Sequence, residues 1–372
     1  MAGYITTALL AGFVTTTAAR QCQNLTIPIV ASARNGVFDL AAPKTNIDVV
    51  NFVLDATQPG HNITAELLTG YATVSGNYSI AATYCQPDDG PGTTLQVLTH
   101  GVGFDRSYWD FPTNNYNYSY VNQALNRGYS TFAYDRLGIG ESSHGDPINE
   151  IQSYLEIAAL RTLTTMLRES AVPGITANFS KIAHVGHSYG SVETYGLVAL
   201  DPTISDGIVL TGFSKDPNFI PEFSLGANEI LANTFARLSN YVDGYIVTAT
   251  VSALQADFFS PRDFDPAVLE AAFQTGQPNS IGEVLTMNGA YDAPNPYQGP
   301  VMVITGERDV PFCGGNCSAT EPSIPEMVQH SFQNATYFDA VIVTGSGHGL
   351  NLEYTWPTTY SNILDFIDKH VK

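Results

Sequence analysis

The stretch Lys181-Ile182-Ala183-His184-Val185-Gly186-His187-Ser188-Tyr189-Gly190 decides the fold of this chain. Its first half predicts a short buried strand, and residues 191–200 behind it predict a helix. A G-x-S-x-G pattern joins the two, which places Ser188 on a sharp turn with its hydroxyl above the edge of a sheet. Glycines fit at both ends of the pattern because a side chain there would collide across so tight a turn. We therefore predict that Ser188 is a nucleophile.

A serine hydroxyl needs a base to take its proton, and that base needs a third group to orient it. Two later strand-like segments end in loops that carry such residues. The sequence predicts His348, in a glycine-rich loop, as the base and Asp309 as the orienting acid. Glu307, two residues before Asp309, is the competing acid. His187, inside the serine pattern, is expected to point away from Ser188.

An oxyanion hole requires two N–H donors aimed at the oxygen that becomes charged. One donor is expected from Tyr189, which directly follows the serine. The other is expected from the loop His100-Gly101-Val102-Gly103-Phe104, which follows another strand-like segment. We assign it to Val102, with the neighbouring Gly103 as the alternative. His100 is expected to brace this loop and not to serve as a second base.

Strand-like and helix-like segments alternate from residue 78 onward, which predicts a mostly parallel α/β sheet flanked by helices. Residues 213–299 interrupt the alternation with many phenylalanines, several prolines and helical stretches. They predict an inserted helical cap over the catalytic end of the sheet. The expected organisation is a signal peptide at 1–19, an N-terminal extension packed on the core at 20–77, the core at 78–212 and 300–372, and the cap at 213–299.

Four motifs follow one another along the chain: HGVGF at 100–104, DRLGIGES at 135–142, GHSYG at 186–190, and the loops that carry Asp309 and His348. In this order they resemble the α/β-hydrolase superfamily, in particular its capped branch with an HG-x-G oxyanion loop. The resemblance covers residues 78–372 and implies an α/β-hydrolase fold. Among known types the chain is most similar to secreted fungal α/β-hydrolases.

Two features depart from relatives within this superfamily. Leu137 shifts the usual Arg-Gly adjacency of the D-x-R-G-x-G-x-S loop. That loop is structural in the superfamily, so no catalytic role is carried onto Asp135 or Arg136. The serine at position 188 differs from the aspartate that dehalogenases and epoxide hydrolases use as nucleophile.

Together these residues predict a serine hydrolase that cleaves carboxylic esters or lactones of apolar small molecules through an acyl-enzyme, with no cofactor and no metal. Phe104, Tyr108 and Trp109, with some phenylalanines of the cap, are expected to line the substrate pocket. A lyase, isomerase or cyclase is the alternative, because the same constellation can act without water. A binding protein with a relic site is the third hypothesis.

The charge and hydropathy of the chain exclude some partners. The formal net charge of −20 argues against nucleic acid, whose phosphates require a basic patch. It also disfavours stable association with an anionic membrane. Outside the N-terminus, no stretch approaches the ~20 apolar residues that a membrane-spanning helix needs.

The N-terminus and the cysteines predict secretion. Met1–Ala19 holds an apolar segment followed by small residues, as in a signal peptide cleaved near Ala19. Disulfides are expected between Cys22 and Cys85 and between Cys313 and Cys317. Zinc is the rival explanation for C-x3-C, but no histidine lies near it. Seven N-x-S/T sequons predict glycosylation at Asn24, Asn62, Asn77, Asn117, Asn178, Asn316 and Asn334.

Overall fold

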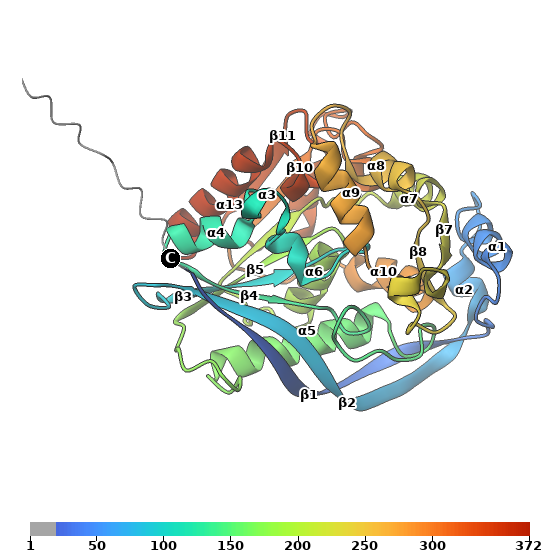
Figure 1. Cartoon of the computed structure of the whole chain (residues 1–372), viewed down its shortest axis with the longest axis horizontal. Coiled ribbons are helices and arrows are strands. Elements are labelled where there is room, and N and C mark those ends of the chain that lie inside the picture. The colour runs from blue at the N-terminus through green and yellow to red at the C-terminus, as the bar shows by residue number, and fades with distance from the viewer. Residues whose placement is uncertain (1–19) are drawn as a thin grey trace, which may run out of the picture.

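The computed structural model describes residues 20–372 (Figure 1). The expected signal peptide, residues 1–19, lies outside the described residues. The main sheet has eight strands in the order β1-β2-β4-β3-β5-β6-β10-β11. Their bounds are β1 Arg20–Phe38, β2 Leu68–Pro87, β3 Thr94–Thr99, β4 Ser130–Tyr134, β5 Lys181–His187, β6 Gly207–Thr211, β10 Val301–Gly306 and β11 Phe338–Val343.

Within this sheet, the strands β4, β3, β5, β6, β10 and β11 run parallel, and the antiparallel pairs are β1–β2 and β2–β4. The mostly parallel sheet predicted from the alternating segments is therefore confirmed. Because the carboxyl ends of parallel strands share one edge of a sheet, the loops after β3, β5 and β10 meet there.

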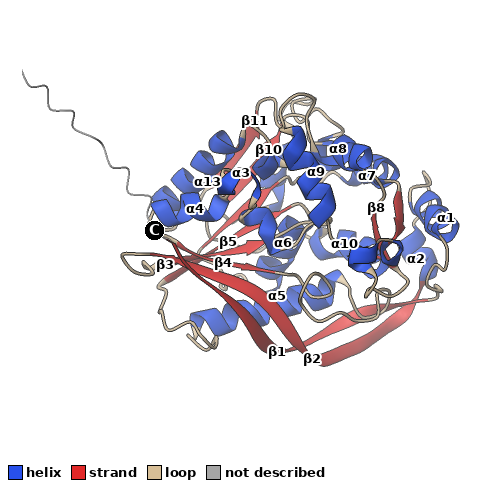
Figure 2. Cartoon of the chain, viewed as in Figure 1, coloured by secondary structure: helices blue, strands red, loops and turns tan. Residues whose placement is uncertain are grey.

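Helices cover both faces of the sheet (Figures 1 and 2). Their bounds are α4 Tyr120–Asn126, α5 Ser153–Arg168, α6 Tyr189–Leu200 and α13 Trp356–His370. Val97 and Leu210 belong to the apolar cluster that includes α5 and α6 residues, whereas Leu98 and Val209 belong to the cluster that includes α4 and α13 residues. Successive strand residues point to opposite faces, so strands buried on both sides are apolar throughout.

The N-terminal segment differs from the expected extension. Strands β1 and β2 are part of the main sheet, where they pair along almost their whole length (Figure 1). Much of this ribbon is exposed, so its strands carry many polar residues. Between them lie α1 Asn46–Ala56 and α2 Ile63–Leu67.

The cap is not wholly helical, which corrects the prediction for residues 213–299. It contains the expected helices α7 Ile220–Ala227, α8 Val251–Phe258, α9 Pro266–Thr275 and α10 Ile281–Tyr291. It also contains a three-stranded antiparallel sheet of β7 Glu229–Leu231, β8 Tyr245–Thr248 and β9 Asn279–Ser280. Strands this short leave no readable alternation in the sequence.

Short helical turns complete the described chain. The α-helical ones are α3 Thr113–Tyr116, α11 Val310–Cys313 and α12 Ile324–Met327. The 3-10 turns are η1 Arg106–Trp109, η2 Pro217–Phe219, η3 Ala232–Thr234, η4 Ala236–Leu238, η5 Val328–Ser331 and η6 Leu350–Leu352.

The cysteines form the two expected disulfides. Cys22 pairs with Cys85 across β1 and β2, and Cys313 pairs with Cys317 after α11. The first bond lies within the strand pairing, where the two residues are register partners. It therefore links the start of the described chain to the main sheet.

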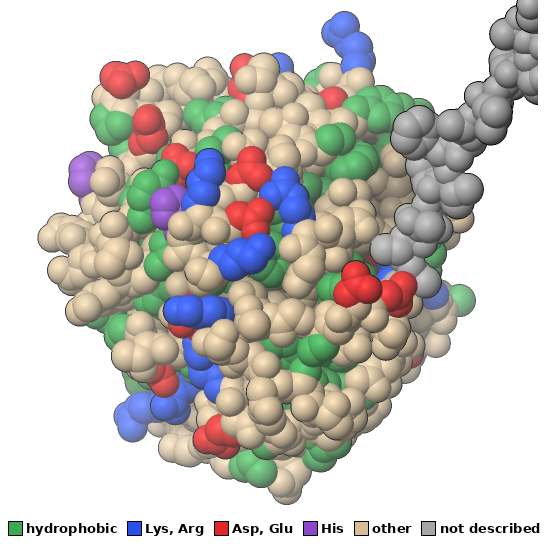
Figure 3. Space-filling view, turned by 90° about the vertical axis from the view of Figure 1, so that its left-hand side faces the viewer, with side chains coloured by type: hydrophobic (Ala, Val, Ile, Leu, Met, Phe, Trp, Pro, Cys, Tyr) green, Lys and Arg blue, Asp and Glu red, His purple; other side chains and the backbone are tan. Residues whose placement is uncertain are grey.

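The surface mixes charges of both signs. On the face in Figure 3, Lys and Arg side chains are interspersed with Asp and Glu. Arg127, for example, pairs with Asp365 and Asp368 at 2.9 and 2.6 Å. Within residues 20–372, no helix is long and apolar enough to cross a bilayer.

Candidate active site

The turn between β5 and α6 holds Ser188 in a strained conformation. Its φ of 55° and ψ of −120° lie in a region that non-glycine residues rarely adopt. A Cβ on Gly186 would lie 2.3 Å from the carbonyl oxygen of Gly190, and a Cβ on Gly190 would lie 2.3 Å from that of Thr99. Only glycines therefore allow β5, α6 and the end of β3 to approach this closely.

The structure brings Ser188, His348 and Asp309 together from three separate loops. The Oγ of Ser188 lies 2.9 Å from Nε2 of His348, whose Nδ1 lies 2.7 Å from Oδ2 of Asp309. With an Nδ1–H donor to Asp309, Nε2 is free to accept the serine proton. Ser188 is 5% exposed and His348 is 1% exposed, so these hydrogen bonds are shielded from solvent.

Asp309, and not Glu307, faces the histidine. The N–H of Phe312 donates to Oδ1 of Asp309 at 2.9 Å, which leaves Oδ2 directed at His348. Glu307 instead accepts from the N–H of Gly345 at 2.8 Å and so holds the start of the histidine loop.

A buried carboxyl that the sequence analysis did not identify also supports this loop. Glu353 accepts hydrogen bonds from the Ser346 hydroxyl at 2.6 Å, the Gly347 N–H at 2.7 Å and the Ser260 N–H at 2.5 Å. Ser260 follows the cap helix α8, so Glu353 ties the loop of His348 to the cap. A carboxyl five residues after the histidine was the available signal, but nothing in the sequence shows that it turns inward.

The two expected oxyanion donors lie beside the serine. Val102 and Tyr189 both border the same cavity as Ser188. Tyr189 begins α6, so its N–H belongs to the first turn of a helix, where backbone donors have no partner within the helix. The alternative donor, Gly103, is not among the residues that border the cavity.

His100 connects the oxyanion loop to the loop after β4. Its Nε2 accepts from the N–H of Arg136 at 3.0 Å, and its Nδ1–H donates to the carbonyl of Gly101 at 2.8 Å. Complete burial lowers the pKa of His100 well below the usual range, so the ring is neutral with one proton on Nδ1. Both ring nitrogens are hydrogen-bonded to the backbone, so His100 holds the two loops together, as expected.

His187 lies next to the histidine of the site without joining its hydrogen bonds. Its ring stacks on Tyr108 at 4.4 Å and lies 4.9 Å from the ring of His348. Its Nδ1 lies 3.0 Å from the hydroxyl of Thr211. Burial lowers its pKa well below the usual range, so His187 is an uncharged neighbour of His348.

A cavity of about 300 Å³ opens at Ser188 between the sheet edge and the cap. Its apolar wall includes Val102, Ile220, Phe223, Met287 and Phe312. The segment that contains helices α1 and α2, which the sequence analysis did not connect with the site, contributes residues 56–57 and 61–64. A larger hollow of about 610 Å³, bordered by Arg106 and Arg237, includes none of the three residues Ser188, His348 and Asp309.

The prediction that Phe104, Tyr108 and Trp109 line the pocket is wrong. All three are at least 97% buried, and none borders the cavity. The 3-10 turn η1 directs Tyr108 and Trp109 inward, where Tyr108 donates to the carbonyl of Gly349 at 3.1 Å. Phe104 packs on Phe258 of the cap at 5.3 Å. These aromatic rings therefore pack in the core behind the loops of the site and do not line the cavity.

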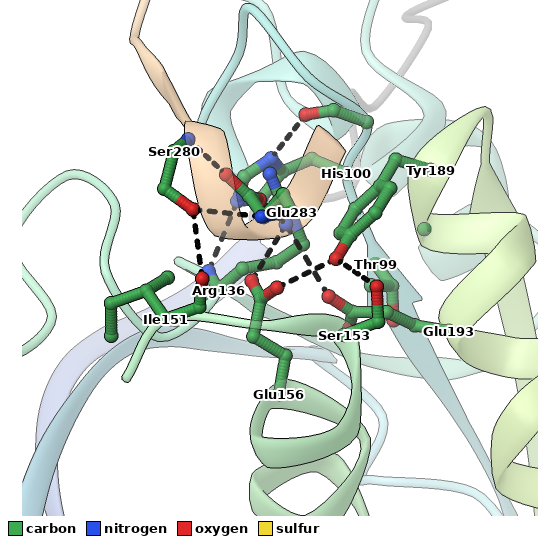
Figure 4. Close-up of polar contacts among 12 residues, drawn as sticks. Thr99, His100, Arg136, Ile151, Ser153, Glu156, Tyr189, Glu193, Ser280 and Glu283 are labelled. Atoms are coloured by element: carbon green, nitrogen blue, oxygen red, sulfur yellow. Dashed lines mark hydrogen bonds and ion pairs between the residues drawn. The ribbon is translucent and has the colours of Figure 1, made fainter. Parts of the chain in front are cut away.

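A buried ionic cluster underlies Tyr189 (Figure 4). Arg136, with no exposed surface, contacts Glu156 at 2.7 Å, Glu193 at 3.3 Å and Glu283. The Tyr189 ring lies over this guanidinium at 4.4 Å, and its hydroxyl donates to Glu156 at 2.8 Å. The cluster thus fixes the residue directly after Ser188.

One guanidinium cannot balance three buried carboxylates, so the cluster retains protons. Burial raises the pKa of Glu156 and of Glu193 above the usual range, and the mutual repulsion of the glutamates adds to the effect. Burial also raises the pKa of Glu353 to about 8 and that of Asp257, in the cap, to about 8.

Comparisons with known proteins agree with this architecture. The model of the "Alpha/beta hydrolase family" matches residues 96–355. No curated protein matches the chain in sequence.

Solved structures share the fold at low sequence identity. An esterase from Thermogutta terrifontis superposes with a TM-score of 0.53 at 16% identity, over 79% of this chain and 94% of its own. An alpha/beta hydrolase fold protein from Chitinophaga pinensis gives 0.53 at 13% identity, with the same coverage. Epoxide Hydrolase A from Mycobacterium thermoresistibile gives 0.51 at 15% identity, over 79% and 96%.

The buried carboxyls predict that stability falls as the pH rises from about 6.5 to 8; at lower pH the buried neutral histidines His100 and His187 oppose this effect, because the unfolded chain protonates its histidines. Folded Glu193 releases its proton near pH 7 and folded Asp257 and Glu353 release theirs near pH 8, whereas the unfolded chain releases all three near pH 4. The folded state therefore binds more protons, and the free energy of unfolding decreases with pH, by at least about 2 kcal/mol. Urea denaturation at pH 6.5 and 8.0 in 0.2 M salt measures the difference.

Glu353→Gln provides the matched control, because it keeps the shape of the side chain and removes one of these titrations. Its free energy of unfolding should depend less on pH than that of the wild type. Equal stability of the wild type at both pH values would contradict the prediction.

Proposed function

The chain belongs to the alpha/beta hydrolase family, and on that premise we propose that it is a secreted serine hydrolase that cleaves carboxylic esters or lactones of small, largely apolar molecules. The observation that carries the proposal is the continuous hydrogen-bonded series Ser188–His348–Asp309 at the edge of a cavity. The esterase from Thermogutta terrifontis, which shares the fold, is consistent with it.

In the first half of the reaction, Oγ of Ser188 attacks the ester carbonyl while its proton passes to Nε2 of His348. The carbonyl electron pair moves to the oxygen, which the N–H groups of Tyr189 and Val102 would bind. When the carbon–oxygen bond to the alcohol breaks, the alcohol leaves with the proton from His348. Asp309 stabilises the imidazolium in between.

In the second half, water repeats these steps on the acyl-enzyme. His348 takes a proton from the water, whose oxygen bonds to the acyl carbon, and Ser188 leaves with the proton returned by His348. The product acid carries one oxygen from water. A cyclic ester would give a hydroxy acid by the same route.

Labelling with a fluorophosphonate tests whether Ser188 is activated. We expect one modified peptide, which contains Ser188, and no label on it in Ser188→Ala or His348→Ala. Ester turnover should fall at least about a thousandfold in both variants. The exposed Ser239 gives a matched control, since Ser239→Ala should be labelled like the wild type. Full ester turnover by folded Ser188→Ala would refute the proposal.

The low exposure of Ser188 and His348 is the one observation that favours the alternative of a lyase, isomerase or cyclase, because such reactions need water excluded. Turnover in 18O-labelled water separates the two. Hydrolysis should place one 18O atom in the product acid. An unlabelled product whose formation requires Ser188 would establish the alternative.

Secretion is proposed from the N-terminal segment, the two disulfides and the sequons. All seven sequon asparagines are exposed: Asn24, Asn62, Asn77, Asn117, Asn178, Asn316 and Asn334. Exposure is what an N-linked glycan requires, because the glycan must extend into solvent. The disulfides are consistent with an oxidising compartment.

Expression in a eukaryotic host with the native N-terminus tests this part of the proposal. The protein should appear in the medium with a mature chain that begins near residue 20, and its mass should fall on treatment with an N-glycosidase. Retention inside the cell, or a mass that the glycosidase does not change, would argue against secretion or glycosylation respectively.

A further inference from the structure

The cap side of the cavity at Ser188 is acidic. Glu229, at the start of β7, and Glu283, on α10, both border the cavity together with Asn279. The residues that border the cavity, all in the described part of the chain, include no Lys or Arg. The cavity therefore combines an apolar wall with an end that carries only carboxyl charges.

Glu283 and Glu229 differ in how their charge is compensated. The two oxygens of Glu283 contact the guanidinium of Arg136 and the N–H of Ser280, so this carboxylate is already paired (Figure 4). Glu229 instead forms a side-chain hydrogen bond with the uncharged amide of Asn279. Glu229 is half-buried at the cavity, and this enclosure raises its pKa to about 7.

A second carboxyl without a compensating charge lies behind Glu229. Asp257, on α8, is 2% exposed, and its Oδ2 has no hydrogen-bond partner within residues 20–372. Its Oδ1 fits against Gly226 on α7, where a methyl group would approach it to 2.3 Å. The charge of Glu229 contributes to the raised pKa of Asp257, so the two carboxyls interact electrostatically.

Enclosed carboxylates are unfavourable without a cation or sufficient donors. The described residues place no Lys or Arg at the cavity, the histidine that borders it, His61, lies 3.2 Å from Glu66, and the space beside Glu229 is open to a ligand. We propose that this cavity selects esters that carry a protonated amine, which Glu229 binds while Ser188 reacts with the ester carbonyl. The inference rests on the proposed esterase function and adds the substrate class: cationic amino esters ahead of neutral ones, with anionic esters disfavoured.

Competitive inhibition by small probes of equal length tests the selectivity. The probes are n-butylammonium, n-butanol and n-butyrate, used against hydrolysis of neutral p-nitrophenyl acetate at pH 8, where an alkylammonium keeps its charge. The inhibition constant of n-butylammonium should be at least about tenfold below that of n-butanol, and n-butyrate should be the weakest. Equal inhibition by the ammonium and the alcohol in the wild type would overturn the proposal without any variant.

Two variants assign the effect to Glu229. In Glu229→Gln, a neutral side chain of the same shape, the advantage of n-butylammonium over n-butanol should fall to within about twofold. Glu222→Gln removes the same charge from an exposed position on α7 and should keep both the full advantage and the wild-type rate. An advantage that survives Glu229→Gln would contradict the assignment.

A separate measurement distinguishes failure of this inference from failure of the esterase proposal. Binding of n-butylammonium and n-butanol to Ser188→Ala, followed by calorimetry, requires no turnover. If the wild type hydrolyses no ester but Ser188→Ala binds the ammonium more tightly than the alcohol, the esterase proposal fails and the amine site stands. If esters are hydrolysed but the two probes bind equally, the amine site fails alone.

Discussion

Backbone segments meet at the carboxyl edge of the sheet at distances that leave no room for side chains. Gly190 packs on the carbonyls of Thr99 and His100, and Gly186 packs on Gly190. At the end of β10, a Cβ on Gly306 would lie 1.9 Å from the carbonyl of Gly347. These contacts bring the loops of the oxyanion donor, the serine and the histidine into one place. The hydrogen bonds of Ser188, His348 and Asp309 depend on this approach.

The ionic cluster joins the core to the cap around the same edge. Arg136 follows β4, Glu156 and Glu193 lie on α5 and α6, and Glu283 comes from the cap helix α10. Buried ion pairs contribute little net stability, because desolvation of the charges opposes their attraction. Their geometry is specific, however, and here it fixes the ring of Tyr189 and the position of α10 together. The cap side of the cavity, which Glu283 borders, is therefore positioned by its contact with Arg136 of the core.

Much of the site could be predicted because its catalytic residues lie in short, recognisable sequence patterns. The glycines around Ser188 and the short loops that carry Asp309 and His348 follow apolar strands that are readable without a structure. The choice of Asp309 over Glu307 needed coordinates, since both follow the same strand within reach of the histidine loop. The role given to Phe104, Tyr108 and Trp109 was wrong because residue type does not show which way a 3-10 turn directs its side chains.

The sequence by itself determined the parallel core, the order of the motifs and the strained turn at Ser188. Each of these depends on neighbours in the chain or on residue types with few alternatives. The tertiary structure alone decided that β1 and β2 extend the main sheet, that the cap contains its own small sheet, and that Glu229, Glu283 and Glu353 lie around the site. Those features arise from contacts between segments far apart in the chain, where burial of a polar side chain depends on a partner that no local pattern specifies.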